Sequence, residues 1–346
     1  MLKPRPASGI RLTCLTGLAL VLGIVSAAAQ DRPWLDPKLL EAAKKEGTLT
    51  VYSSTNEQEG LVLFKLFESA TGIKVQYVRA ADSVLSSRMV IEARGGKPSF
   101  DIVHMTATNR LPPQILAQYE PPEAKHISPD ARDPDRRWWG VYAVYNTPAY
   151  NTKMVKAGEI PKSYEEMAKL KHLKGKVAID GTDAEWLRGL TIHYGEKKGL
   201  QIARDLKTNL DPILTVGHLA LSRSVGSGEY ALSLNNYTNL DVNVKLGGAA
   251  IEVFALDPVT QFFGTVGVNA KAPHPNAARL AANFMLSQEM QQLYTKFGRP
   301  PTRNDVKTSP PGVYENIKKR KLVTTLMTAG DDKKWSKLFD DIFKRR

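Results

Sequence analysis

One stretch decides the fold: Gly47–Glu59, with the sequence GTLTVYSSTNEQE. Its apolar and β-branched first half predicts a buried strand, which stops abruptly at small hydroxyl residues. Ser54 and Asn56 each precede a glutamate by three residues, the spacing of a capping box, so a helix is predicted to begin at one of the two. Apolar residues at helical spacing, a stop at Gly72 and an alternating run over Ile73–Tyr77 complete a βαβ unit.

The carboxyl end of the first strand is predicted to carry a ligand-binding loop. In a βαβ unit the free amides of the helix N-terminus, with their partial positive charge, point at whatever lies beyond the strand. Small polar residues are also good helix caps, so a single loop of this kind needs no function. The pattern recurs, however, after four further predicted strands: Phe100–Met105, Lys176–Asp180, Ile213–Val216 and Tyr230–Leu234. The candidate ligand-binding residues at these strand ends are Ser53, Ser54, Thr55, Asn56, Thr106, Thr182, His218, Asn236 and Tyr237.

The N-terminus reads as a secretory signal peptide. Three basic residues precede the uncharged run Leu12–Val25, and an Ala-x-Ala site follows, which predicts cleavage after Ala29. The single cysteine, Cys14, lies inside this segment in a poor context for lipid attachment, so the mature chain has no thiol and no disulfide. We therefore expect a free periplasmic protein that begins near Gln30.

The chain is basic, with 48 Lys and Arg against 35 Asp and Glu, a formal net charge of +13. Removing the three basic residues of the signal, which has no acidic residue, leaves +10. Such a charge is typical of nucleic-acid-binding proteins, but the basic residues are spread over the whole length and no nucleic-acid motif accompanies them. We expect a solvated surface with some bias toward anionic partners, and no nucleic-acid partner.

The 317 residues after the signal are too many for one ordinary core and predict two domains. An aromatic strand at Trp138–Asn146 carries the chain out of the first domain, and the helices after Pro273 return to it. The expected parts are a signal peptide over 1–29, a discontinuous first domain over 30–143 and 259–300, a second domain over 144–258, and a C-terminal helical segment over 301–346.

Six short motifs follow one another in an order that resembles the extracellular solute-binding proteins of ABC importers, and among them the ferric-iron-type binding proteins. They are Leu49–Ser54, Thr71–Val75, Phe100–Val103, Tyr145–Thr147, Gly228–Leu232 and Ala281–Glu289. The resemblance implies a type II α/β fold of two domains, with central mixed sheets, flanking helices and two hinge strands near Ala143–Tyr150 and Phe254–Val259. It also implies a ligand in the cleft between the domains, closure about the hinge strands, and an ABC permease in the inner membrane as partner. We expect a monomer without a cofactor.

The resemblance does not fix the ligand. Iron-binding members use a histidine in the first strand-end loop, an acid in the loop after the third strand, and two adjacent tyrosines in the second domain. The corresponding positions here hold Asn56, Thr106, Asn236 and Tyr237. Only Tyr237 matches, and a hard ferric ion wants several anionic oxygens. Ferric iron is therefore the less favoured ligand, although Tyr142 and Tyr145 could complete an all-tyrosine iron site.

The candidate residues are mainly neutral hydrogen-bonding groups beside helix N-termini, and His218 could add a positive charge. This set favours a small organic or phosphorylated anion, with ferric iron or a metal–anion complex bound through Tyr237 as the alternative.

An enzyme is the competing class, as an exported hydrolase. Ser227 lies between two glycines, but Val225 stands where a nucleophile elbow needs another glycine. The sequence also lacks a phosphate-loop signature and a His-Glu-x-x-His pair. We therefore expect no catalytic activity.

Overall fold

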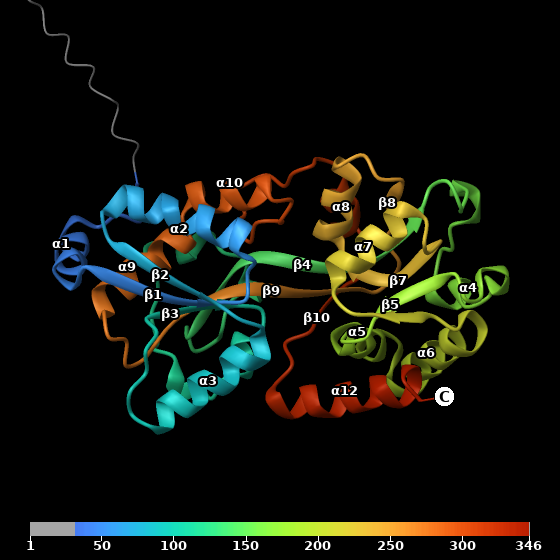
Figure 1. Ribbon diagram of the computed structural model, residues 1–346, viewed down its shortest axis with the longest axis horizontal. Helices are drawn as coiled ribbons and strands as arrows, with labels where there is room; N and C mark the ends of the chain where they lie inside the picture. The colour runs from blue at the N-terminus through green and yellow to red at the C-terminus, as the bar shows by residue number, and fades with distance from the viewer. Residues whose placement is uncertain (1–31, 346) are drawn as a thin grey trace, which may run out of the picture. The chain divides into compact units, whose positions relative to one another are not determined.

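The computed structural model describes residues 32–345 of the 346-residue chain, which are coloured in Figure 1. The predicted signal peptide, with its cleavage after Ala29, lies outside the described residues. Within residues 32–345 no helix is both long enough and apolar enough to span a membrane.

Within this described part, ten strands form one mixed sheet in the order β2-β1-β3-β9-β4-β7-β5-β6, with β10 paired to β9 and β8 to β4. Pairing is parallel at a first end, β2-β1-β3, and at a second end, β7-β5-β6. The two long strands between them, β4 and β9, are antiparallel to each other and join the two ends (Figure 1). The bounds are β1 Thr48–Ser53, β2 Lys74–Arg79, β3 Ile102–Met105, β4 Trp138–Asn151, β5 Val177–Asp180, β6 Ile213–Thr215, β7 Leu232–Tyr237, β8 Ile251–Val253, β9 Val259–Val268 and β10 Leu322–Thr324.

Helices flank the sheet at both ends (Figure 1). The α-helices are α1 Pro37–Glu46, α2 Glu57–Thr71, α3 Asp82–Arg94, α4 Tyr164–Met167, α5 Ala184–Tyr194, α6 Glu196–Leu210, α7 His218–Ser227, α8 Thr238–Leu246, α9 Pro275–Met285, α10 Gln288–Lys296, α11 Val313–Lys318 and α12 Ala329–Phe343. Short 3₁₀ helices are η1 Thr108–Arg110, η2 Pro113–Ile115, η3 Pro122–His126, η4 Pro129–Ala131, η5 Ala157–Glu159 and η6 Lys171–Leu173.

The stretch that decides the fold forms β1, a short turn and the start of α2. Asn56 is the N-cap of α2, because its side chain accepts a hydrogen bond from the Glu59 amide at 3.0 Å. Of the two capping-box spacings in the sequence, the second is therefore the one used. The helix ends at Gly72, whose φ of 75° is the left-handed conformation that glycine adopts without strain.

The apolar core follows the two ends of the sheet. At the first end, α1, α2, α9 and α10 pack on β1, β4 and β9 through buried side chains such as Trp34, Phe64 and Phe284. At the second end, α4, α5, α6 and α12 pack on β5 and β7 through side chains such as Trp186 and Trp335. The division of the chain into two domains, with boundaries at residues 143 and 258, stays a prediction.

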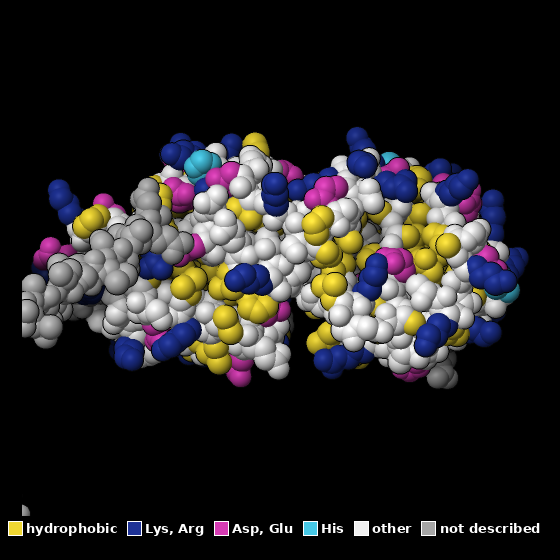
Figure 2. Space-filling view, turned by 90° about the horizontal axis from the view of Figure 1, so that it is seen from above, with side chains coloured by type: hydrophobic (Ala, Val, Ile, Leu, Met, Phe, Trp, Pro, Cys, Tyr) yellow, Lys and Arg dark blue, Asp and Glu magenta, His cyan; other side chains and the backbone are white. Residues whose placement is uncertain are grey.

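Two predicted elements differ from the structure. The strand predicted over Tyr230–Leu234 begins and ends later, so Asn235, Asn236 and Tyr237 lie within β7 rather than in a loop. The segment 301–346 is not helical throughout, because it also contributes β10, which pairs with β9, and its last helix is part of the second core. Figure 2 shows Lys and Arg side chains scattered among Asp and Glu over one face, which agrees with the expected solvated surface.

Candidate functional site

A cavity of about 350 Å³ lies between the two ends of the sheet, and both ends supply its walls. The first end of the sheet contributes Asp82, Ser83, Thr106 and Arg110. The second end contributes Gly181, Thr182, Ala184, Glu185 and Tyr237, and β9 contributes Phe262. The remaining wall comes from α12 and the residue that follows it: Asp332, Ser336, Phe339, Asp340 and Lys344. Of the candidate ligand-binding residues, Thr106, Thr182 and Tyr237 meet at this cavity, as the convergence of strand ends implies.

Tyr237 ends β7 and stacks on His218, the first residue of α7, with ring centroids 3.6 Å apart. Phe262 of β9 makes an edge contact with Tyr237 at 5.5 Å. Burial raises the pKa of the Tyr237 hydroxyl well above its ordinary value, and the charges of Glu185 and Asp183 raise it further. The hydroxyl therefore stays protonated and can donate a hydrogen bond to a bound molecule.

His218 supports Tyr237 rather than lining the cavity itself. Its Nδ1 lies 3.0 Å from Asn236 Oδ1. Burial lowers the pKa of the imidazole, although the nearby Asp180 carboxylate and the Asn236 hydrogen bond oppose the shift. The ring is therefore neutral at pH 7, which corrects the expectation of a protonated His218.

Two threonine hydroxyls of the cavity donate hydrogen bonds to carboxylates. Thr106 donates to Asp82, and Thr182 donates to Asp180 Oδ1 at 2.5 Å. Asp180 is buried and also accepts the Gly217 amide at 2.6 Å, so it ties the loop after β5 to the loop after β6. Because the single proton of each hydroxyl is already in a hydrogen bond, both hydroxyls can act only as hydrogen-bond acceptors toward a bound molecule.

Asn236 makes structural hydrogen bonds, and its role in ligand binding stays a prediction. Its fully buried amide nitrogen donates to Asp241 Oδ1 and Ser222 Oγ, each at 2.8 Å, and to the His218 carbonyl at 3.2 Å. Alternate residues of a strand point to opposite faces, so the later end of β7 turns Asn236 away from the cavity that Tyr237 lines.

The first strand-end loop does not line the cavity, so a role of Ser53, Ser54, Thr55 and Asn56 in ligand binding stays a prediction. Ser53 Oγ lies 3.2 Å from His104 Nδ1 and accepts the Thr55 amide at 3.1 Å. The Ser54 amide donates to the His104 carbonyl at 3.2 Å, and Asn56 caps α2. These polar groups hold the loop against β3, so the simpler interpretation of good caps applies here.

Comparison with known proteins decides the family. The family model described as "Bacterial extracellular solute-binding protein" matches residues 63–321. The chain belongs to this family. The prediction of a solute-binding protein, made from the order of short motifs, is therefore confirmed.

Relatives of this solute-binding protein include periplasmic proteins that bind iron or a sugar phosphate. The "Fe(3+)-binding periplasmic protein" of Serratia marcescens is 25% identical over 199 residues, which cover 55% of this chain and 56% of that relative. Iron-bound HitA from Pseudomonas aeruginosa has a TM-score of 0.71 at 20% identity, covering 85% of this chain and 99% of the other. AfuA from Actinobacillus pleuropneumoniae, with exogenous fructose-6-phosphate bound, has a TM-score of 0.73 at 21% identity, covering 87% and 99%. The predicted type II α/β fold is confirmed.

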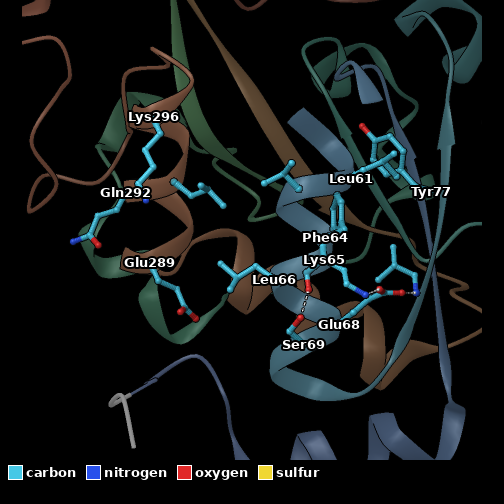
Figure 3. A pocket seen from close by; sticks show the side chains of 13 residues that line it. Leu61, Phe64, Lys65, Leu66, Glu68, Ser69, Tyr77, Glu289, Gln292 and Lys296 are labelled. Carbon is cyan, nitrogen blue, oxygen red and sulfur yellow. Dashed lines mark hydrogen bonds and ion pairs between the residues drawn. The ribbon is translucent and has the colours of Figure 1, made fainter. Parts of the chain in front are cut away.

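A larger hollow of about 820 Å³ lies between α2 and α10 of the solute-binding protein, where Figure 3 shows Leu61 and Leu66 beside Gln292. Its walls are mainly apolar, and the Glu68 carboxylate on its rim already accepts the Val75 amide at 2.9 Å. Solute sites need several polar groups that converge on the bound molecule. We therefore assign the solute to the cavity between the sheet ends.

Sequence reasoning missed the charged walls of that cavity. Arg110 pairs with Glu185 of α5, and its Nη1 lies 3.0 Å from Asp332 Oδ1 of α12. An acid in the first turn of a helix is ordinarily explained by the helix dipole, so Glu185 gave no separate signal. The only signal for Arg110 is that it directly follows the predicted loop after the third strand.

Three helices begin at the cavity without a side-chain cap: α3, α5 and α8. The first amides of a helix have no acceptor within the helix and carry partial positive charge. These starts differ from that of α2, which Asn56 caps. They are the donors that the site can offer to an oxygen-rich group.

Two buried groups give the solute-binding protein a pH-dependent stability of opposite sign. His104 Nε2 lies 2.9 Å from the Tyr294 hydroxyl, and complete burial lowers the pKa of His104 to about 3. Because the unfolded imidazole takes up a proton near pH 6.5, the His104 contribution to the free energy of unfolding is lost as the pH falls from about 6.5 toward 3. Burial raises the pKa of Asp241 to about 7, so its contribution is lost as the pH rises from about 4 toward 7.

Urea unfolding at pH 6 and pH 4.5 should separate the two groups. Relative to wild type, His104→Gln should lose about 2 kcal/mol less of its free energy of unfolding on acidification, because the His104 contribution is gone. Asp241→Asn should lose about 2 kcal/mol more, for the opposite reason. Other titrating groups are common to all three proteins and cancel in the differences, so parallel profiles would contradict the assignment.

Proposed function

We propose that this solute-binding protein is the periplasmic receptor of an ABC importer, which captures a small solute and presents it to a membrane permease. One observation carries the proposal: the cavity is walled by Thr106 from the first end of the sheet and by Thr182 and Tyr237 from the second. A site divided in this way makes its full set of contacts only when both ends meet around the solute. The receptor acts as a monomer and performs no covalent chemistry.

Closure would take place about β4 and β9. Both strands pass from one end of the sheet to the other, and Phe262 of β9 forms part of the cavity wall. A small bend in these two neighbouring strands would let the ends rotate toward each other, which is the hinge type of domain closure. The closed shape is then what a permease recognises.

The solute that the site supports best is a small organic or phosphorylated anion that also carries hydroxyl groups. The uncapped starts of α3, α5 and α8 offer amide donors for anionic oxygens. The lone pairs of Thr106 and Thr182 can accept hydrogen bonds from the solute, and hydroxyl groups of the solute supply the donors. The structural likeness to AfuA with fructose-6-phosphate bound supports the same class.

Ferric iron or a metal–anion complex is the second candidate, favoured by the iron-binding names among the relatives. The donor set fits a bare ferric ion poorly. Among residues 32–345 no group of three or more His, Cys, Asp or Glu side chains is placed to hold a metal ion. Tyr237 is the one phenol of the cavity, and burial keeps its pKa high. A complex that brings its own anion fits better than the ion alone.

A thermal-shift screen of the mature chain tests the proposal with fructose 6-phosphate, citrate, ferric citrate, ferric chloride, fructose and putrescine. We expect fructose 6-phosphate or citrate to raise the Tm. Calorimetry on Tyr237→Phe should then show binding weakened about ten- to a hundred-fold, since a hydrogen bond to a charged group is worth about 1.5–3 kcal/mol. Tyr230→Phe is the matched control, because Tyr230 lies outside the cavity and should leave binding unchanged.

Three results would overturn parts of the proposal. Stabilisation by putrescine or fructose alone would exclude an anionic solute. Tight binding of ferric chloride without added anion, lost in Tyr237→Phe, would make iron the solute. Conversion of a bound compound into product would favour the exported hydrolase instead.

A further inference from the structure

Arg110 crosses from the first end of the sheet to the second. It ends η1, the short helix directly after β3, and its guanidinium pairs with Glu185 at the start of α5 and with Asp332 of α12 at 3.0 Å. The neighbouring Asn109 Nδ2 donates to the Met327 carbonyl at 2.6 Å, just before α12. Through η1, the first end thus contacts two separate elements of the second.

Helix α12 is firmly part of the second end, although it is the last helix of the chain. Trp335, Phe339 and Phe343 are at most 2% exposed and belong to the second core. The guanidinium of Arg188 in α5 lies 4.9 Å above the Trp335 ring. Because α12 is anchored in this way, its contact with Arg110 joins the two ends of the sheet.

The contact depends on the ends being close together. Glu185 and Asp332 are both acidic and approach the same guanidinium, so without Arg110 they would face each other as like charges. The side chains of Arg110 and Glu185 are 24% and 19% exposed, so the pair is partly shielded from water and from salt. If the ends separate, Arg110 loses both partners at once.

We propose that Arg110, Glu185 and Asp332 form a latch that favours the closed arrangement, and that α12 therefore takes part in solute capture. The inference rests on the hinge closure proposed above. Asp332 and Glu185 also line the cavity, so the latch closes one side of the site and limits the size of the solute that fits.

Distances between spin labels in the mature chain test the latch without any solute. The sequence has no cysteine after Cys14, so Lys97→Cys and Lys197→Cys supply the only two labels, one on each end of the sheet. Both side chains are exposed, so a label at either position should leave the packing unchanged. Arg110→Gln should lower the ratio of short to long distances about ten-fold, and Asp332→Asn should change it in the same direction.

Asp341→Asn is the matched control. Asp341 lies on α12 as well, but its ion pairs with Lys337 and Arg345 stay at the second end. It should leave the distances unchanged, whereas 1 M NaCl should shift the wild type toward the long distances as Arg110→Gln does. Unchanged distances in Arg110→Gln, or an equal shift in Asp341→Asn, would overturn the latch.

The spin-label distances test the latch independently of the thermal-shift screen, which tests the solute class. A shift in Arg110→Gln without any bound solute supports the latch even if the proposed solute class is wrong. Solute binding together with an unshifted Arg110→Gln rejects the latch and leaves the proposed function standing.

Discussion

Replacement of Arg303 by methionine is expected to lower the free energy of unfolding by about 3–5 kcal/mol. The side chain is 3% exposed, and its guanidinium donates four hydrogen bonds. Nη1 donates to Glu123 Oε2 at 2.6 Å and to the Leu286 carbonyl at 2.8 Å, while Nε and Nη2 each donate to Asp305 at 2.8 Å. Methionine would leave the buried Glu123 carboxylate without its cation, which costs far more than the loss of a surface ion pair.

Urea unfolding followed by tryptophan fluorescence measures this loss. Arg136→Met is the matched control, because Arg136 and Glu120 form an exposed pair with side chains 63% and 50% accessible, and it should cost less than about 1 kcal/mol. Adding Glu123→Leu to Arg303→Met should restore part of the stability, since both members of the pair are then apolar. Equal losses in Arg303→Met and Arg136→Met would contradict the prediction.

Replacement of Gly264 by alanine is the second large effect, at about 3 kcal/mol or more. Gly264 of β9 lies opposite Tyr142 of β4, and the Tyr142 ring lies directly over it. A Cβ at Gly264 would be 2.0 Å from the ring carbon that bears the hydroxyl. The ring cannot move away easily, because the Arg299 guanidinium lies 4.3 Å from its centre and the Tyr294 ring 5.1 Å.

A double-mutant cycle identifies the cause of that loss. In a Tyr142→Ala background, which removes the ring, Gly264→Ala should cost less than about 1 kcal/mol. Gly158→Ala serves as the control for the glycine itself, since Gly158 is exposed and no atom would meet its added Cβ within 4 Å. If Gly264→Ala costs as much with Tyr142→Ala as without it, steric overlap is not the reason.

The sequence predicts the fold well because local signals and the order of motifs agree. The apolar, β-branched run before Ser53 and the cap at Asn56 place β1 and α2, and the glycine stop ends the helix at Gly72. The extension of β7 was not predicted, because Asn235 and Asn236 are typical loop residues. Their place in a strand depends on buried partners such as Asp241, which lie on another element.

The site is predictable only in part, and the reason is distance along the chain. Thr106, Thr182 and Tyr237 each lie at or just after the end of a strand, so their convergence can be inferred from strand order alone. Arg110 and Asp332 are more than 200 residues apart, and no local pattern pairs them. Conversely, Ser53 looked like a binding residue because the sequence cannot tell a hydroxyl that binds solute from one that contacts His104.

Because α12 lies at the end of the chain, the second core can fold only late in synthesis. The second core needs Trp335, Phe339 and Phe343, and the central pairing of β4 with β9 joins segments more than 100 residues apart. The ribosome must therefore release the chain through β9 before the central strands can pair, and through α12 before the second core can form. Contacts of such long range form slowly. During that interval the nascent polypeptide lacks its native second core. An incompletely folded chain of this kind can still pass through a secretion channel.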